Sequence, residues 1–243
     1  MNSSTPRPLQ ILNIVSVLLF IISLGMIFFY APREAVMGEA QRIFYYHVPS
    51  AWVSFLSLFI AVITGTLVLS RGQGNMKNLI ILTSISAVIT AIAYFAPRLP
   101  IEKSMKEIAS GISLVSGTAL AYFGGLAIGV KLQRDPKFWD NVGLSSIEVG
   151  IVFAIMTLFS GMLWARPSWN TWWTWDPRLT TYAILLLIYF AYLMLRQGIE
   201  DPDKRARFGS VYGIIGFISV PITYFSIFLW RTIHPAVFGS NDS

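Results

Sequence analysis

Seven long runs of apolar residues restrict this chain to one kind of fold. A helix needs about 20 mostly apolar residues to cross the hydrocarbon core of a bilayer, and runs of this length are too long for the elements of a soluble core. Only helices and closed barrels satisfy the backbone inside a bilayer. We therefore expect an all-α fold, a polytopic transmembrane helical bundle of about seven spans, near residues 9–30, 51–70, 79–96, 111–130, 148–165, 181–195 and 210–230.

The composition indicates that only short segments lie outside these spans. Of the 243 residues, 55% are apolar and only 12% are charged, and the charged residues fall in short stretches between the apolar runs. We therefore expect a single integral membrane domain over residues 1–243, with no sizeable soluble domain. The run at 9–30 is longer than a signal-peptide core, and no small-x-small cleavage pattern follows it, which predicts a retained first helix. Pro221 predicts a kink in the last span.

The chain contains no cysteine. This excludes disulfides, thiolate metal sites and thioether attachment of a prosthetic group, so any metal must be bound by other side chains. No grouping of acid, base and nucleophile is visible in the sequence, which predicts no enzyme activity for this chain alone.

An odd number of spans places the two ends of the chain on opposite sides of the membrane. If the N-terminus is inside, the C-terminal tail and three loops lie outside, at residues 31–50, 97–110 and 166–180. Eight of the Lys and Arg residues then lie outside and ten inside, a weak positive-inside bias that favours a cytoplasmic N-terminus. The inner ones are Arg7, Arg71, Lys77, Lys131, Arg134, Lys137, Arg196, Lys204, Arg205 and Arg207. The net charge of +6 is dispersed over many loops, which indicates contact with lipid headgroups and not with nucleic acid.

Only two histidines occur in the sequence, and the expected topology places both on the outer side. His47, within Tyr-Tyr-His-Val-Pro, precedes the second span, and His234, within Ile-His-Pro, follows the last one. Neutral imidazole binds heme iron well, and two imidazoles on opposite sides of a porphyrin give six-coordinate iron without a thiolate. The alternative is an ordinary interfacial histidine, because imidazole is stable at the level of the headgroups. A transmembrane di-heme cytochrome would carry several histidines within its spans, and this sequence has none there.

Tryptophan is concentrated on the same side. All of the eight tryptophans except Trp139 fall on the outer side or at outer helix ends. Four residues are spaced as i, i+3, i+4 and i+7, namely Trp169, Trp172, Trp173 and Asp176. This spacing predicts a short Trp-rich surface helix on the outer face that presents three indoles and can cover the apolar part of a porphyrin. An aromatic belt is the alternative, although a belt would populate both interfaces.

Charged residues border this segment. Asp176 precedes Pro177 and is well placed to cap the helix that begins there, because the carboxylate accepts backbone N–H bonds and proline suits the first helical position. Arg166 and Arg178 flank the tryptophans, and a guanidinium is suited to pair with a heme propionate. Anchoring to lipid phosphate is the alternative role for both arginines.

The stretch from Trp169 to Thr180, read W-N-T-W-W-T-W-D-P-R-L-T, resembles the "WWD" signature of the heme-handling proteins of cytochrome c maturation, most closely the CcmC type. We take residues 164–180 as the WWD segment. The Tyr-His-Val-Pro context of His47, and His234 after the next pair of helices, belong to the same resemblance, which covers residues 1–70 and 148–238.

The resemblance implies non-covalent, transient binding of heme b at the periplasmic face of the inner (cytoplasmic) membrane. It implies that His47 and His234 are the axial iron ligands and that the WWD segment binds the heme edge. The candidate heme-binding residues are His47, His234, Trp169, Trp172, Trp173, Trp175, Asp176, Arg166 and Arg178. The implied partners are a periplasmic heme chaperone of the CcmE type, ABC transporter subunits of the CcmA and CcmB types, a small CcmD-type subunit and membrane lipid.

The sequence departs from the family pattern at three places. The pattern has six spans, and residues 71–147 are read here as an extra helical hairpin. The pattern also has a span after the second histidine, which does not occur before Ser243. Asn170 stands where the signature usually has glycine.

A rival hypothesis is a membrane subunit that binds a quinone or a small organic substrate, with the tryptophans as an ordinary pocket. A scaffold for an ABC transporter is a third. Solute transport through the core predicts polar or charged residues within the spans, where they are scarce. A protein-specific heme absorbance separates the first hypothesis from the other two.

Overall fold

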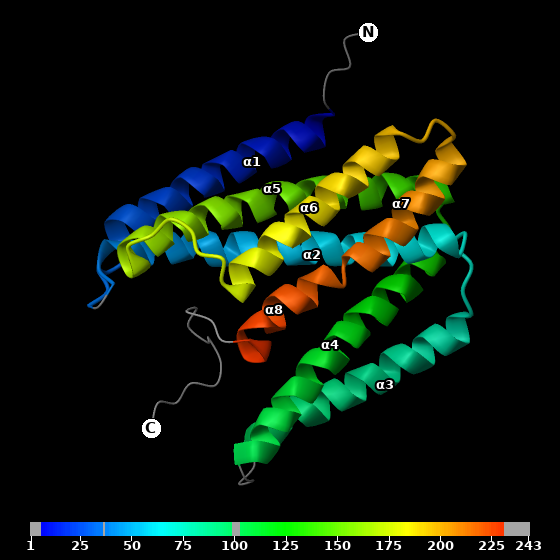
Figure 1. Ribbon diagram of the computed structural model, residues 1–243. Coiled ribbons are helices and arrows are strands. Elements are labelled where there is room, and N and C mark those ends of the chain that lie inside the picture. The colour runs from blue at the N-terminus through cyan, green and yellow to red at the C-terminus, as the bar shows by residue number, and fades with distance from the viewer. Residues whose placement is uncertain (1–5, 36, 99–102, 231–243) are drawn as a thin grey trace. The chain divides into compact units, whose positions relative to one another are not determined.

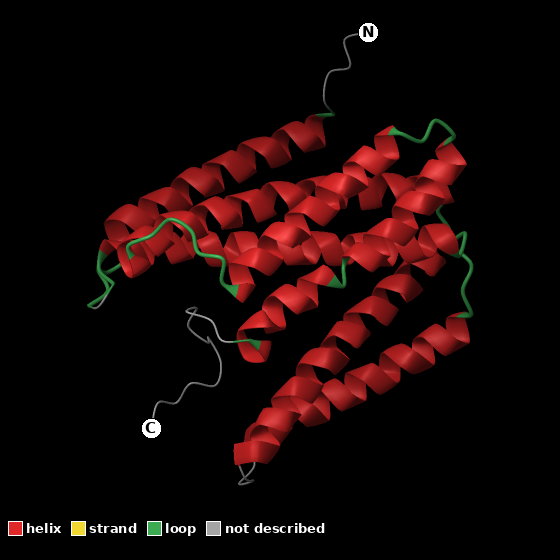
Figure 2. Ribbon diagram, in the orientation of Figure 1, coloured by secondary structure: helices red, strands yellow, loops and turns green. Residues whose placement is uncertain are grey.

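The computed structural model describes residues 6–35, 37–98 and 103–230. Within these residues all named elements are helical and none is a strand, as Figure 2 shows, so the predicted all-α fold is confirmed. The α-helices are α1 (Arg7–Gly25), α2 (Phe44–Leu69), α3 (Met76–Phe95), α4 (Lys103–Leu132), α5 (Pro136–Trp169), α6 (Pro177–Gln197), α7 (Pro202–Gly216) and α8 (Ser219–Leu229). Shorter helical turns are η1 (Met26–Tyr30), η2 (Glu39–Ile43) and η3 (Ala96–Arg98).

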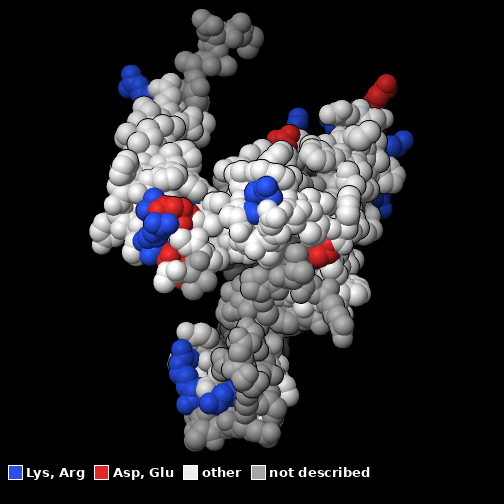
Figure 3. Space-filling view, turned by 60° about the vertical axis from the view of Figure 1, so that its left-hand side comes forward, with Lys and Arg blue, Asp and Glu red and all other residues white. Residues whose placement is uncertain are grey.

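Seven helical segments of the described chain are long and apolar enough to cross a membrane. Each overlaps one of the predicted runs, which confirms a multi-pass membrane protein. On the face drawn in Figure 3, charged side chains lie in separate groups with uncharged surface between them. The segments are Arg7–Tyr30, Glu39–Leu69, Met76–Arg98, Ile108–Leu132, Pro136–Trp169, Pro177–Gln197 and Pro202–Ile227.

The last of these segments consists of two helices, α7 and α8, with a break at Phe217 and Ile218. Pro221 explains the break. Proline has no N–H to donate to the carbonyl of Phe217, four residues earlier, and its ring would clash with that carbonyl in a continuous helix. In α8 it occupies the third position, where a backbone N–H has no acceptor within the helix. The predicted kink near Pro221 is confirmed.

The chain divides into two compact units, and each is described by itself. The first contains residues up to 52 together with 153–174, and the second contains residues 53–152 together with those from 175 onward. The backbones of α2 and α5 therefore each contribute one part to each unit.

In the first unit, the first turns of α2 pack on neighbouring elements through aromatic and charged side chains. The ring of Phe20 in α1 lies 6.2 Å from the ring of Tyr46 in α2. Just before α2, the turn η2 contains an ion pair in which Arg42 Nη1 lies 2.9 Å from Glu39 Oε2. The first turn of α2 thus contacts α1 through an aromatic pair, and the turn η2 before it contains a local ion pair.

In the second unit, a core cluster joins helices that are distant in sequence. Its buried members are Leu67 and Val68 of α2, Leu126 of α4 and Trp139 of α5. Helices α3 and α4 lie side by side (Figure 1), and the hydroxyl of Thr90 in α3 donates to that of Ser116 in α4 at 3.0 Å. Hydrogen bonds of this kind satisfy polar side chains between membrane helices.

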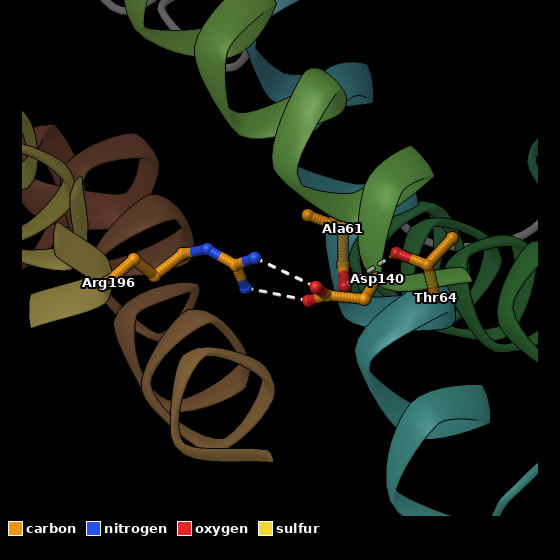
Figure 4. A network of polar contacts seen from close by, with 4 residues as sticks. All are labelled: Ala61, Thr64, Asp140 and Arg196. Atoms are coloured by element: carbon orange, nitrogen blue, oxygen red, sulfur yellow. Dashed lines mark hydrogen bonds and ion pairs between the residues drawn. The ribbon is translucent and has the colours of Figure 1, made fainter. Parts of the chain in front are cut away.

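One buried ion pair joins two helices of the second unit. Arg196 of α6 donates through Nη1 and Nη2 to the two carboxylate oxygens of Asp140 in α5, at 2.6 and 2.8 Å (Figure 4). The side chains are only 7% and 13% exposed. A planar guanidinium fork that matches both oxygens is a geometrically specific link, because few other pairs can replace it.

Candidate functional site

His47 lies in the first turn of α2, and not in a loop before the second span as the sequence suggested. The sequence placed the second span near residues 51–70 and His47 in the loop at 31–50. The helix begins earlier, at Phe44, directly after the turn η2. The imidazole is therefore attached to regular helical backbone, which restricts its position more than a loop would.

The imidazole contacts α5 through a hydrogen bond. His47 Nδ1 lies 3.1 Å from Ser160 Oγ, and the Ser160 hydroxyl lies 2.7 Å from the carbonyl of Met156, one turn earlier in the same helix. A serine hydroxyl has one hydrogen, and the shorter contact, to the helix carbonyl, favours donation to that carbonyl. Ser160 Oγ then accepts from the ring, which favours the tautomer with hydrogen on Nδ1 and a lone pair on Nε2.

The next residue of α5, Gly161, leaves room for the same ring. A Cβ atom built at this position would lie 3.1 Å from His47 Cε1 and 3.5 Å from Nδ1. The first distance is shorter than an ordinary van der Waals contact, so any larger residue at 161 would push the imidazole away. Ser160 and Gly161 therefore define the position of the imidazole edge together.

A chain of aromatic contacts leads from His47 to the WWD segment. The ring centroid of Phe44, one turn before His47, lies 6.3 Å from the imidazole centroid and 5.2 Å from the indole of Trp164. Trp164 in turn lies 4.9 Å from Trp169. All three pairs meet edge to face, at 75°, 81° and 84°, which is a favoured arrangement of aromatic rings. The structure thus places His47 and Trp169 in one aromatic cluster, Phe44–His47–Trp164–Trp169.

The predicted surface helix through the tryptophans is wrong. Helix α5 ends at Trp169, and residues 170–176 form no helix before α6 begins at Pro177. Asn170 has a left-handed backbone with φ of +57°, which ends α5. The Asp-Pro pair at 176–177 favours extended backbone before the next helix. The residues between Asn170, which ends α5, and Asp176, which precedes α6, are therefore too few to form a helix of their own. Trp169 is therefore on a helix, whereas Trp172 and Trp173 lie on the link.

A side chain from the last turn of α5 caps the C-terminus of that helix. Arg166 Nη1 donates to the carbonyl of Asn170 at 2.6 Å and also to the Asn170 side-chain oxygen. The same guanidinium lies 6.0 Å from the ring of Trp172, which is 51% exposed. A cation at a helix C-terminus stabilises the unpaired carbonyls and interacts favourably with an aromatic face.

Three other predicted site residues belong to the second unit. Asp176 Oδ1 accepts from the backbone N–H of Leu179 at 3.1 Å, so the predicted capping of α6 is confirmed. Trp175 is 78% exposed. Arg178 lies in the first turn of α6 and is partly buried. The remaining predicted residue, His234, lies outside the described residues.

Sequence reasoning missed the residues that contact His47. Phe44 was assigned to a loop, and Trp164 was placed in the WWD segment but not among the candidate heme-binding residues. Ser160 is 113 positions from His47 along the chain. No local pattern signals such a pairing between helices, because it depends on how α5 packs against the first turn of α2.

Comparison with known proteins supports the predicted resemblance over the C-terminal half. A model of the heme exporter protein C family, CcmC, matches residues 119–239. Among relatives named heme exporter protein C, that of Bradyrhizobium diazoefficiens is 36% identical over 108 residues, which are 44% of this chain and 41% of the relative. That of Escherichia coli K12 is 30% identical over 124 residues, 51% and 48% of the two chains. That of Haemophilus influenzae is 35% identical over 118 residues, 48% of each.

The chain thus spans less than half the length of these curated relatives. The family match includes the end of α4, all of α5, the link at 170–176 and helices α6 to α8. His47 precedes the matched range, so its part in the resemblance stays a prediction from the sequence. Over residues 119–239, which include the WWD segment, the chain is similar to the heme exporter protein C family.

Proposed function

We propose that this protein binds heme non-covalently at the outer membrane face and delivers it for the maturation of cytochrome c. The match of residues 119–239 to the heme exporter protein C family supports heme as the substrate. The observation that carries the proposal for this particular chain is the His47 imidazole, hydrogen-bonded through Nδ1 to Ser160 and included in an aromatic cluster. These are the properties that an axial histidine requires.

The chemistry of His47 fits heme iron. A neutral imidazole that donates from Nδ1 has its lone pair on Nε2, and iron-binding histidines commonly have such a partner on the other ring nitrogen. The neighbouring rings of Phe44 and Trp164 supply an apolar surface of the kind that a porphyrin requires. We propose His234 as the second axial ligand.

The other candidate residues would bind the rest of the heme. We propose that the indoles of Trp169, Trp172 and Trp173 cover the porphyrin edge, with Trp175 and Asp176 completing the segment. Arg166 and Arg178 would pair with the propionates, since guanidinium groups bind carboxylates well. We propose that the bound heme is heme b. Because the chain has no cysteine, the heme would be released without breaking a thioether bond.

We further propose an inner-membrane location with a cytoplasmic N-terminus and the heme site on the periplasmic face. The acceptor would be a heme chaperone of the CcmE type, and subunits of the CcmA, CcmB and CcmD types would assemble with this chain. In this scheme the chain positions and releases heme and turns over no substrate by itself.

The experiment that tests the proposal is the visible spectrum of the detergent-purified full chain, oxidised and then reduced, before and after heme is supplied. We expect a sharp bis-histidine spectrum in the wild type and its loss when His47→Ala and His234→Ala are combined. A well-folded wild type that takes up no heme would contradict the proposal and favour the quinone or small-substrate hypothesis.

A further inference from the structure

We propose that Ser160 and Gly161 are positioning residues for the heme ligand. This inference rests on the function proposed above. It gives two residues in the C-terminal half of α5 a specific role, which is to select the tautomer of His47 and to fix the position of its Nε2 atom. Neither residue would touch the heme. Both act only through the imidazole.

The first argument is the direction of the hydrogen bond. The Ser160 hydroxyl lies 2.7 Å from the Met156 carbonyl and 3.1 Å from the Thr157 carbonyl. Two carbonyl acceptors favour donation within α5, which presents the Ser160 oxygen to His47 as an acceptor. An acceptor at Nδ1 retains hydrogen there and places the lone pair on Nε2. It also makes the imidazole a stronger electron donor to iron.

The second argument is steric. The imidazole edge lies over Gly161 so closely that even a methyl group would come within 3.1 Å of Cε1. The glycine therefore lets the ring approach α5 to hydrogen-bonding distance of Ser160. Without that approach the 3.1 Å bond between Nδ1 and the hydroxyl would lengthen, because both contacts involve the same edge of the ring.

The chain offers matched controls for both residues. Ser110 in α4 makes the same kind of bond, from its hydroxyl to the Lys106 carbonyl at 2.9 Å, but it is exposed. A Cβ atom at Gly111 would meet nothing within 4 Å. Ser110→Ala and Gly111→Ala therefore change a membrane helix in the same chemical way without affecting His47.

The test is a heme titration of the purified full chain, with the spectrum and the midpoint potential of the bound heme as readouts. Loss of an outer-shell hydrogen bond typically weakens metal binding about 10- to 100-fold, and a neutral serine belongs at the lower end. We expect Ser160→Ala to weaken heme binding about 10-fold and to raise the midpoint potential, because a less basic imidazole stabilises ferric iron less. Ser160→Thr, which keeps the hydroxyl, should restore both quantities.

Gly161→Ala gives an independent result. Alanine favours the helix over glycine, so if Gly161 does not position His47, the heme-free protein should keep the same or a higher thermal stability and heme binding should be unchanged. Positioning predicts weaker heme binding and an altered spectrum, with Gly111→Ala like the wild type.

The outcomes separate this inference from the proposed function. If the wild type binds heme and His47→Ala abolishes binding, but Ser160→Ala and Gly161→Ala behave like their controls, the positioning role is overturned and the heme site remains. The positioning role is also overturned if Ser160→Thr is as weak as Ser160→Ala. If the wild type binds no heme, or if His47→Ala binds it normally, the result contradicts the proposed heme site itself and not only the positioning role.

Discussion

At the scale of single residues, the boundaries of the WWD link are set by two capping interactions. Arg166 donates to Asn170 at the end of α5, and Asp176 accepts from Leu179 at the start of α6. Both charged residues were considered as possible contacts of a bound ligand, and both have a structural role without any ligand. A substitution at either position can therefore change the site by changing the backbone that carries the indoles.

The cap of α6 can be separated from a role at the heme. Asp176→Ala removes the acceptor for the Leu179 N–H, and loss of such a cap costs about 1 kcal/mol of unfolding free energy. Asp176→Asn keeps an acceptor oxygen and should cost only a few tenths. Thermal or denaturant unfolding of the heme-free protein in detergent measures the loss of unfolding free energy in both variants. If asparagine is as destabilising as alanine, capping does not explain the contribution of Asp176.

The left-handed backbone of Asn170 gives a second prediction at this scale. With φ of +57°, this position accepts asparagine or glycine and strains a β-branched residue. Asn170→Val should destabilise the protein by roughly 1–3 kcal/mol, whereas Asn170→Gly should retain most of the stability. The two variants, compared with wild type by the same unfolding assay, test the conformation directly. Equal stability of the valine variant would show that residue 170 is not left-handed.

At the scale of helices, the sequence predicted the spans well and the connection between α5 and α6 poorly. Apolar runs identify membrane helices because a bilayer requires a minimum length of apolar side chains. The tryptophan spacing suggested a surface helix, but the left-handed Asn170 and the Asp176-Pro177 pair override a spacing that rests on so few residues. The contact between His47 and Ser160 had no local signal at all, because residues on different helices meet only after the helices pack.

The Asp140–Arg196 pair tests how α5 and α6 are held together. Asp140→Ala would leave Arg196 buried without its carboxylate, and breaking a buried pair in this way costs roughly 3–5 kcal/mol. Replacing both residues, with Asp140→Leu and Arg196→Met, should recover much of this loss because no charge stays buried. The measurement compares the unfolding free energies of the single variant, the double variant and the wild type.

An exposed ion pair supplies the control for this prediction. Arg33 Nε lies 3.7 Å from Glu39 Oε1, and these side chains are 72% and 57% exposed. Arg33→Ala should change stability by less than about 1 kcal/mol, since solvent screens such a pair. A similar small effect of Asp140→Ala would mean that the buried pair contributes little to holding α5 and α6 together.

At the scale of the whole molecule, seven described segments are long and apolar enough to cross the membrane. If each crosses once, α1 begins and α8 ends on opposite sides. The length and apolar character of these segments were predictable from the sequence. The orientation is only weakly indicated, because ten against eight basic residues is a small bias. Orientation nevertheless decides on which side of the membrane the proposed heme site lies.

The absence of cysteine makes the orientation directly testable. Single cysteines at Ser168, near the end of α5, and at Gln133, between α4 and α5, should lie on opposite sides. With a cytoplasmic N-terminus, a membrane-impermeant thiol reagent added to intact cells should label Ser168→Cys, and Gln133→Cys only after the membrane is permeabilised. The reverse pattern would place the WWD segment, and the proposed heme site with it, on the cytoplasmic side.

The interaction between Arg166 and Asn170 also has a consequence for sequence variation among relatives. Arg166 donates both to the backbone and to the side chain of Asn170, so the two positions are chemically coupled. A relative with glycine at the position of Asn170 keeps the left-handed turn but loses the side-chain half of the interaction. The two positions should therefore covary, with arginine at 166 accompanying asparagine at 170 more often than it accompanies glycine.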